Sequence, residues 1–302
     1  MFTKELGKTG VQIPEVGLGT WHYHAGPEPL RQGLDAGACF IDTAESYDTE
    51  EVVRQAMGQH RDEVFLASKV SPSNFRRADL LKAAEGSLRR LGTDRIDLYQ
   101  LHKPNDAIPL EETLGAMEEL VDAGKVRFIG VSNFSQSELQ RAQRAMRMHP
   151  IVSNQMRYNL VDRTISEGLL RYCQANGVTL IAYSPLARGF SHIRDYDAQG
   201  ILPKLSEATG RTPVQIALNW CLCQAGVVAI PKGNSVEHVV ENCGASGWRL
   251  NPEQLSQLDH AIAFKRRSGA EQFLRRHLPP SCKETIQRLA TFLPPIIRRR
   301  IH

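Results

Sequence analysis

The sequence predicts an α/β protein built as one (β/α)8 barrel, the TIM-barrel fold, and three observations lead to that prediction. Short apolar runs alternate with amphipathic stretches along the chain of 302 residues, and eight such pairs follow one another. The runs are nearly continuous in apolar residues, which is typical of a parallel sheet covered on both faces. The repeat is about thirty residues long, the size of one βα unit. Eight units in series favour a closed barrel over an open sheet.

The strands are expected where β-branched or apolar runs stand between turn residues. A two-stranded hairpin comes first, because FTKEL and VQIPE flank the turn sequence GKTG. The barrel strands are expected at residues 16–20, 39–43, 64–70, 96–102, 126–132, 152–158, 178–184 and 227–231. An open nucleotide-binding sheet would carry GxGxxG after its first strand. Only Gly17 and Gly19 occur there, which favours the closed barrel.

The helices are expected in the amphipathic segments that follow the strands. These segments are residues 29–37, 49–58, 77–92, 110–125, 135–146, 165–177, 213–226 and 235–243. Glycines stand at five helix ends, where a left-handed cap residue is favoured: Gly37, Gly92, Gly124, Gly177 and Gly226. Ser135 and Thr212 stand at helix starts, and Pro213 follows Thr212 at the first helical position.

The composition fits a globular protein without a membrane span. Hydrophobic residues make up 41% of the chain and charged residues 23%, close to the average of globular proteins. No apolar run is long enough for a transmembrane helix, and MFTKELGKTG lacks the apolar core of a secretory signal. The six cysteines show no CxxC or zinc-finger spacing, so we expect reduced packing residues and no metal site. A cytoplasmic protein is therefore expected.

The positive charge is concentrated in the last segment of the chain. Residues 265–302 carry ten basic and two acidic side chains, a net charge of +8, whereas the whole chain has +4. Residues 1–264 are therefore mildly acidic, at −4, which argues against nucleic acid as a partner. We expect a barrel at 1–264 and a basic C-terminal extension at 265–302. The extension contains the amphipathic run TIQRLATFL and is either an appendage of the barrel or a surface helix for an acidic membrane or partner.

Ionisable side chains stand at three neighbouring strand ends. The second strand ends in Asp42, and Tyr47 follows in the next loop. The third strand carries Lys69 near its end, and the fourth ends in His102. Taken singly, the aspartate could cap a helix, the lysine could reach solvent and the histidine could be a hydrogen-bonded core residue. Because the carboxyl ends of barrel strands open on one face, their occurrence together favours a catalytic site.

The four side chains fit an acid–base site around a phenol. A free tyrosine has a pKa near ~10, and a neighbouring ammonium is expected to lower it. Asp42 would keep Lys69 charged and in place. Tyr47 would then donate a proton to a developing alkoxide, and a neutral His102 would orient the substrate oxygen. No nucleophile with a base is evident, so a hydride cofactor is the expected electron source.

The motifs at these strand ends resemble those of the aldo-keto reductase superfamily. The resemblance covers residues 2–262 and is carried by GLGTW, DTAESYDTEE, ASKV, LYQLHKP, GKVRFIGVSNF, NQMRYN, YSPLARG and IPKGNSVEHVVEN. These motifs occur in the order and at the spacing of the family. The resemblance implies a (β/α)8 barrel that binds NADP(H) at the carboxyl ends of its strands and reduces aldehydes or ketones.

The resemblance also implies roles for the residues at matching positions. The catalytic tetrad would be Asp42, Tyr47, Lys69 and His102. The nicotinamide carboxamide would be held by Ser132, Asn133 and Gln155, with Tyr183 stacked on the ring. Further cofactor contacts are implied for Thr20, Trp21, Asp42, Ser184, Pro185, Leu186, Arg188, Ile230, Lys232, Asn234, His238, Glu241 and Asn242. The substrate pocket would include Trp21, Tyr23, Tyr47, His102 and Lys103.

Several positions depart from the family pattern. The family often has Ser and Arg where this chain has Gly233 and His238, beside the expected adenosine 2′-phosphate. NADP(H) is the expected cofactor, and use of NAD(H) is left open. Lys103 replaces a tryptophan common in the family, and it either points to solvent or suits the pocket to anionic or polyhydroxylated carbonyls.

The expected function is reduction of a small-molecule carbonyl by a monomer or weak oligomer. The alternative is a non-catalytic NADP(H)-binding regulatory subunit on the same fold, against which the complete tetrad argues. Between the aspartate and the tyrosine of the tetrad, Glu45 and Ser46 are expected to be solvated loop residues.

Overall fold

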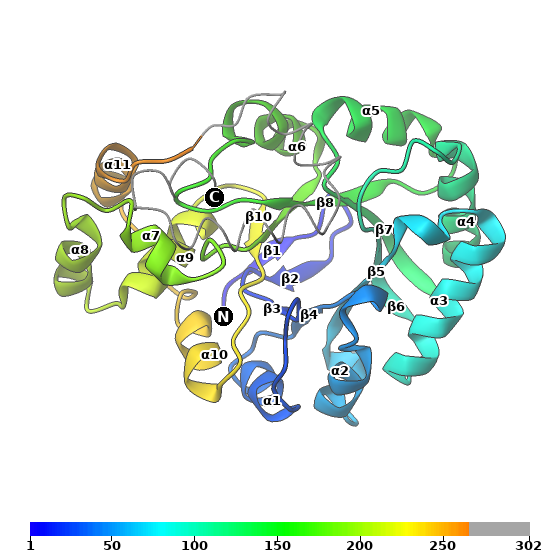
Figure 1. Ribbon diagram of the computed structural model, residues 1–302, viewed down its shortest axis with the longest axis horizontal. Helices are drawn as coiled ribbons and strands as arrows, with labels where there is room; N and C mark the ends of the chain where they lie inside the picture. The colour runs from blue at the N-terminus through cyan, green and yellow to red at the C-terminus, as the bar shows by residue number, and fades with distance from the viewer. Residues whose placement is uncertain (266–302) are drawn as a thin grey trace, which may run out of the picture.

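Eight parallel strands form the central sheet of the structure, a computed structural model that describes residues 1–265 (Figure 1). The strands neighbour one another in chain order: β3 (Leu18–Gly19), β4 (Phe40–Asp42), β5 (Phe65–Val70), β6 (Ile96–Leu101), β7 (Val126–Ser132), β8 (Ile151–Arg157), β9 (Thr179–Tyr183) and β10 (Val227–Ala229). The sheet closes on itself because Val16, just before β3, forms a parallel bridge with Ala229. The predicted (β/α)8 barrel is confirmed.

Closure brings the first and last strands into close backbone contact at Gly19. The amide nitrogen of Gly19 donates to the carbonyl oxygen of Pro231 at 3.1 Å. A Cβ atom on Gly19 would lie 2.6 Å from the carbonyl oxygen of Ile230, which is closer than real Cβ contacts allow. The barrel can therefore close only because this position lacks a side chain.

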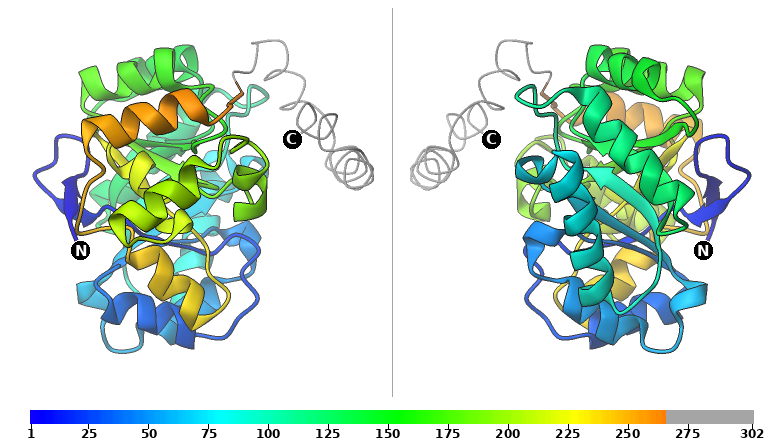
Figure 2. Two further views of the ribbon diagram at one scale, coloured as in Figure 1. Left: turned by 90° about the vertical axis from the view of Figure 1, so that its left-hand side faces the viewer. Right: turned by 90° about the vertical axis from the view of Figure 1, so that its right-hand side faces the viewer.

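The predicted N-terminal hairpin is formed by β1 (Thr3–Glu5) and β2 (Gln12–Pro14), and it covers the amino-terminal end of the barrel. Leu6 and Ile13 pack in one buried cluster with Phe40 and Phe65, which begin strands β4 and β5. Figure 2 shows the hairpin on the side of the barrel opposite the loops that follow the strands. The hairpin therefore closes one end of the barrel and leaves the other end for a site.

The eight predicted helices surround the sheet (Figure 1). They are α1 (Glu28–Asp35), α2 (Glu50–Met57), α3 (Arg77–Leu91), α4 (Leu110–Asp122), α5 (Gln136–Ala145), α6 (Arg171–Asn176), α9 (Pro213–Leu222) and α10 (Val236–Cys243). A π-helical turn, Ser166–Leu170, precedes α6. Three further helices were not predicted: α7 (Phe190–Arg194), α8 (Ile201–Thr209) and α11 (Pro252–Ala261). They lie outside the βα repeat, in the connection after β9 and after α10.

The helix ends agree with the signals in the sequence. All five glycines expected at helix ends have positive φ. Ser135 accepts a hydrogen bond from the main chain of Glu138, and Thr212 accepts one from Gln215. In both cases the longer side chain reaches back to the cap residue, which forms a complete capping box.

The end of the described chain is fixed against the loop after β8. The amide nitrogen of Lys265 donates to Val161 O at 2.9 Å, and Lys265 O accepts from Arg163 N at 3.1 Å. The guanidinium of Arg163 lies between the rings of Trp220 and Phe264. The predicted extension beyond Lys265, with the run TIQRLATFL and Cys282, lies outside the described residues.

Two further expectations from the sequence concern membrane-spanning helices and cysteines. No helix within residues 1–265 is both long and apolar enough to cross a membrane. The five cysteines of this part of the chain are free: Cys39, Cys173, Cys221, Cys223 and Cys243.

Candidate active site

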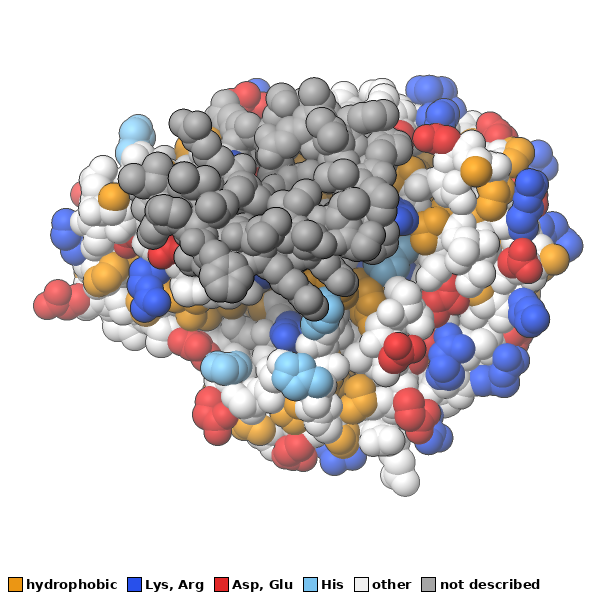
Figure 3. Space-filling model, viewed as in Figure 1, with side chains coloured by type: hydrophobic (Ala, Val, Ile, Leu, Met, Phe, Trp, Pro, Cys, Tyr) orange, Lys and Arg blue, Asp and Glu red, His pale blue; other side chains and the backbone are white. Residues whose placement is uncertain are grey.

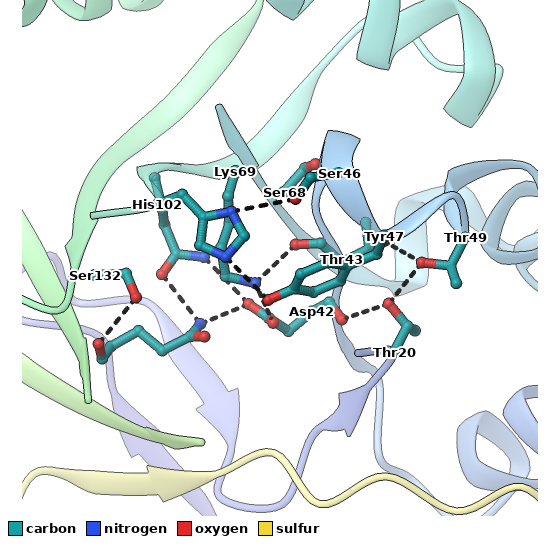
Figure 4. Close-up of polar contacts among 12 residues, drawn as sticks. Thr20, Asp42, Thr43, Ser46, Tyr47, Thr49, Ser68, Lys69, His102 and Ser132 are labelled. Atoms are coloured by element: carbon teal, nitrogen blue, oxygen red, sulfur yellow. Dashed lines mark hydrogen bonds and ion pairs between the residues drawn. The ribbon is translucent and has the colours of Figure 1, made fainter. Parts of the chain in front are cut away.

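The four tetrad positions meet at the open end of the barrel (Figure 4). Asp42 is the last residue of β4, Lys69 lies near the end of β5, and His102 directly follows β6. Tyr47 closes a 3₁₀ turn, Glu45–Tyr47, in the loop after β4. Strand register places these groups at neighbouring positions, because Asp42 pairs with Ala67 and Lys69 pairs with Gln100.

A buried ion pair forms the floor of this site. The ammonium Nζ of Lys69 donates to Asp42 Oδ1 at 2.5 Å and to Thr43 O at 2.8 Å, and the Lys69 side chain is 0% exposed. Burial alone would lower the pKa of Lys69, but the carboxylate of Asp42 and the phenol of Tyr47 outweigh it, so the pKa is raised. The lysine therefore stays charged inside the barrel, and Asp42 does not cap a helix.

Tyr47 directs its hydroxyl toward the lysine and the histidine (Figure 4). Its Oη lies 3.2 Å from Nε2 of His102, and Nζ of Lys69 lies 4.8 Å from the centre of its ring. Burial raises the pKa of Tyr47, and the opposing effect of Lys69 does not overcome it. The expectation that the lysine lowers the Tyr47 pKa below its ordinary value is therefore wrong in this structure. The phenol is held protonated, as a proton donor must be.

His102 is neutral at the pH of ordinary activity assays. Burial, with the charges of Lys69 and Lys103 nearby, lowers the pKa of His102 from 6.5 to about 3. Its main chain is held on both sides, since its amide donates to Val70 O at 3.1 Å and its carbonyl accepts from Asn133 Nδ2 at 3.1 Å. Ser46 Oγ lies 3.5 Å from its Nδ1. The imidazole is thus a positioned hydrogen-bonding group without a charge.

Glu45 is not the solvated loop residue that the sequence suggested. Its Oε1 accepts hydrogen bonds from Ser71 N at 2.5 Å and from Asn74 Nδ2 at 3.0 Å. Ser46 is exposed, as expected, although its hydroxyl reaches His102.

The expected nicotinamide residues form one hydrogen-bonded group beside the tetrad. Asn133 Nδ2 donates to Ser132 Oγ at 3.0 Å, and Tyr183 Oη donates to Asn133 Oδ1 at 2.9 Å. Gln155 Nε2 donates to Asp42 Oδ2 at 2.7 Å, which ties this group to the ion pair. The structure therefore places these four polar side chains in direct continuity with the acid–base residues.

The expected phosphate and adenosine residues lie on the loops after β3, β9 and β10. Lys232 Nζ donates to His22 O at 3.0 Å, and Asn234 Nδ2 lies 3.1 Å from Nε2 of His24, so two loops meet across this part of the face. His22, His24 and His238 are exposed, and Figure 3 shows several histidine side chains on this face. Arg188 stacks on Trp21 with 4.9 Å between its Cζ and the ring centre.

The other expected cofactor positions lie at the ends of β3, β9 and β10 and, for Glu241 and Asn242, on helix α10. Thr20 is buried and its hydroxyl donates to Asp42 O at 3.1 Å. Ser184 has positive φ, 48°, directly after β9. The remaining positions on these elements are Pro185, Leu186, Ile230, Glu241 and Asn242, of which Pro185, Ile230 and Asn242 are buried.

The two aromatic residues proposed for the substrate pocket differ in exposure. Trp21 is 41% exposed, whereas Tyr23 is buried in the core between helices and sheet, and its hydroxyl donates to Gly26 O at 2.7 Å. Trp21 is therefore partly exposed beside Arg188, and Tyr23 does not direct its hydroxyl into the site.

Residues 15–263 match the model of the aldo/keto reductase family. This chain belongs to that family. It is 36% identical to methylglyoxal reductase YeaE of Escherichia coli over 261 residues, which cover 83% of this chain and 92% of the relative. The reductase is also similar to two solved structures, both aldo-keto reductases.

One is the aldo-keto reductase of Klebsiella pneumoniae in complex with NADPH, at 41% identity and a TM-score of 0.81, covering 88% of this chain and 98% of that one. The other is the thermostable aldo-keto reductase Tm1743, in complex with the inhibitor epalrestat. It is 43% identical with a TM-score of 0.79, and the match covers 86% of this chain and 99% of that one. The reductase is therefore an oxidoreductase.

Sequence reasoning missed Gln100, which lies between two groups of the site. Its Nε2 donates to Asp42 Oδ2 at 3.2 Å, and its Oε1 accepts from Gln155 Nε2 at 3.3 Å. The signal was present, since a residue two positions before His102 faces the same side of the strand. Within residues 1–265, no group of three or more His, Cys, Asp or Glu side chains is arranged to hold a metal ion.

Proposed function

We propose that this reductase converts aldehydes or ketones to alcohols with NADPH as the preferred reductant and Tyr47 as general acid. The observation that carries the proposal is the position of the Tyr47 hydroxyl, 3.2 Å from the neutral imidazole of His102 and above a buried, charged lysine. These are the groups that a carbonyl needs while its oxygen gains negative charge.

The residues beside the tetrad fit a nicotinamide cofactor. Asn133 and Gln155 supply amide groups that match a carboxamide, and Tyr183 supplies an aromatic ring, while Lys232 offers an exposed cation for a phosphate. When bound, the cofactor supplies a hydride to the carbonyl carbon. The similar Klebsiella pneumoniae structure is a complex with NADPH, which supports the same cofactor for this reductase.

The protein's part in the reaction is the delivery of one proton. Tyr47 gives its phenolic proton to the carbonyl oxygen while the carbon gains the hydride, so that carbonyl, hydride and proton balance as an alcohol. Lys69 stabilises the resulting phenolate, and the charge of Asp42 keeps the lysine in place. His102, as a neutral imidazole, orients the oxygen without competing for the proton.

The preference for NADPH over NADH rests on Lys232, since Gly233 and His238 supply neither the serine nor the arginine of related sequences. Gly233 itself has a packing reason, because a Cβ atom there would lie 2.7 Å from Cγ2 of Val239. We expect a higher kcat/KM with NADPH than with NADH, and a reduced ratio in Lys232→Ala. Equal kcat/KM values for the two cofactors in the wild type would contradict the preference.

Small polar aldehydes are the proposed substrate class, because the similar Escherichia coli protein is named a methylglyoxal reductase. Lys103 is exposed, as the simpler interpretation expected, yet its charge acts on His102 at the mouth. It could therefore attract anionic carbonyls. The test is Lys103→Trp, which should lower kcat/KM for carboxylated aldehydes relative to neutral ones; an unchanged ranking would contradict the role of Lys103.

The decisive experiment follows NADPH oxidation with methylglyoxal and a panel of aldehydes and ketones. Tyr47→Phe should abolish turnover and keep NADP⁺ binding, because only the proton donor is lost. Tyr172→Phe is the matched control, since the Tyr172 hydroxyl donates to Gln143 on the outer helices and should leave turnover unchanged. Turnover by Tyr47→Phe at the wild-type rate would overturn the proposal, and binding without turnover in the wild type would support a regulatory subunit.

A further inference from the structure

The turn that carries Tyr47 is tied by side chains to the strands on either side of it. The turn is a single 3₁₀ turn of residues 45–47, between Asp42 and helix α2, and it is too short to be held in place by its own main-chain hydrogen bonds. Its last residue is followed by Asp48, which has a left-handed backbone with φ of 56°. The position of the phenol therefore depends on contacts at the two ends of the turn.

Threonine hydroxyls hold the far end of the turn (Figure 4). Thr49 Oγ1 lies 2.8 Å from Thr43 Oγ1 and 2.9 Å from Thr20 Oγ1, and all three residues are buried. This group joins the start of α2 to the ends of β3 and β4.

Glu45 holds the near end of the turn. Its single oxygen Oε1 accepts from Ser71 N at 2.5 Å and from Asn74 Nδ2 at 3.0 Å. Ser71 directly follows β5, the strand that carries Lys69. The next loop is joined in turn, because Asn105 Nδ2 donates to Pro72 O at 2.8 Å. Glu45 is thus the direct link between the segment with the phenol and the segment with the ammonium.

We propose that Glu45 is a positioning residue for Tyr47, which it holds at the correct distance from Lys69 and His102. The inference rests on the proposed function, in which Tyr47 is the general acid. The carboxylate of Glu45 forms no hydrogen bond with the four tetrad side chains. Glu45 acts on Tyr47 indirectly, by fixing the turn that carries it. Two hydrogen bonds to one carboxylate oxygen fix both the direction and the distance of the turn.

The consequence concerns the chemical step. Without this tie the turn can move relative to β5, and the phenol no longer stays at its place over the lysine. A misplacement of a catalytic group by about 1 Å can cost on the order of 100-fold in rate. Cofactor binding should not change, because the carboxylate of Glu45 bonds Ser71 and Asn74 and not the expected nicotinamide residues, which lie on or directly after β7, β8 and β9.

The test compares Glu45→Ala with Glu45→Gln. We expect Glu45→Ala to lower kcat about 10- to 100-fold. The affinity for NADP⁺, measured by fluorescence titration, should stay within experimental error of the wild type. The isotope effect with NADPH deuterated at the transferred position should rise, as the chemical step becomes rate-limiting. Glu45→Gln keeps an oxygen that can accept both hydrogen bonds and should restore most of kcat.

Glu51→Ala is the matched control, since Glu51 is exposed on α2 and its carboxylate pairs with Arg54 of the same helix. It should leave kcat unchanged. The imidazole NMR signals of His102 supply a readout that needs no turnover: they should shift in Glu45→Ala and not in Glu45→Gln or Glu51→Ala, because Tyr47 contacts this ring.

Wild-type kcat in Glu45→Ala would overturn the proposal. A loss of kcat that Glu45→Gln does not restore would overturn it as well. If Glu45→Ala fails to fold, Asn74→Ala decides, because it removes one of the two donors; a smaller loss of kcat is expected, and no loss would overturn the proposal. The proposed function is judged separately, by wild-type turnover and its loss in Tyr47→Phe.

Discussion

The two buried charges of the site, Asp42 and Lys69, are matched to specific partners inside the barrel. Asp42 receives Lys69 on Oδ1 and the amides of Gln100 and Gln155 on Oδ2. A charge buried this deeply is tolerated only when it is paired and hydrogen-bonded. Burying the pair costs desolvation free energy, so its role is in the site and not in stability. Each charge is tolerated only while the other is present.

That dependence predicts a result for stability. Lys69→Met leaves the Asp42 carboxylate buried without its counter-ion, so the free energy of unfolding should fall by about 3–5 kcal/mol. The double variant Asp42→Asn/Lys69→Met removes both charges and should recover a large part of that loss. Chemical denaturation of the wild type, the two single variants Asp42→Asn and Lys69→Met, and the double variant measures the effect. Simple addition of the two single losses would contradict the coupling.

The protonation of His102 predicts the pH dependence of the reaction. Because its pKa is lowered to about 3, the kcat/KM profile should show no inflection near 6.5 that belongs to this residue. As the pH falls, the imidazole of His102 takes up a proton in the unfolded chain before it does so in the folded chain. The contribution of His102 to the free energy of unfolding should therefore decrease from pH 6.5 toward about 3. An inflection near the ordinary histidine pKa that disappears in His102→Asn would refute the neutral imidazole.

At the scale of elements, side-chain hydrogen bonds join the loops that follow neighbouring strands. Glu45 joins the loop after β4 to the loop after β5, and Asn105 joins that loop to the one after β6. Beyond β10, the loop toward α10 packs closely on the helix it leads into. There Gly233 approaches Val239, with the amide nitrogen of Val239 2.9 Å from a Cβ built on the glycine.

The close approach at Gly233 predicts the effect of a single methyl group. Gly233→Ala should lower the free energy of unfolding by about 1–3 kcal/mol, because the loop or the first turn of α10 must move. Gly115→Ala is the control. A Cβ there meets open space on α4, so the change should be neutral or stabilising by up to ~1 kcal/mol. Thermal unfolding measures both, and equal melting temperatures would contradict the packing argument.

At the scale of the whole molecule, the barrel is complete within the described residues. The hairpin covers one end, Val16 and Ala229 close the sheet, and Lys265 pairs with the loop after β8. The division into a barrel and a C-terminal extension stays a prediction; Lys265, the first residue of the predicted extension, is bonded through its main chain to the loop after β8.

Truncation after Lys265 should therefore leave a folded and active barrel. We expect the melting temperature and kcat of the 1–265 chain to equal those of the full chain. A clear loss of either would show that the extension belongs to the barrel. Liposomes with acidic lipids test the membrane alternative. Binding of the full chain together with no binding of the shortened chain would support it.

The sequence alone determined the parts of this protein that local patterns encode. Apolar periodicity and cap residues predicted eight strands and eight helices, because each depends on neighbours within one or two turns. The order of strand ends placed Asp42, Lys69 and His102 on one face, since parallel strands of a barrel share an end. Helices α7, α8 and α11 escaped prediction because they follow no βα repeat.

The tertiary structure decided what depends on several distant segments at once. The pKa of Tyr47 is raised, not lowered, because burial by the whole barrel mouth outweighs one lysine. Glu45 became a link between loops only when Ser71 and Asn74 were brought beside it. Desolvation depends on all the atoms around a group, and long-range hydrogen bonds join segments that are far apart in the sequence. Only the folded chain could therefore determine the direction of the Tyr47 pKa shift and the partners of Glu45.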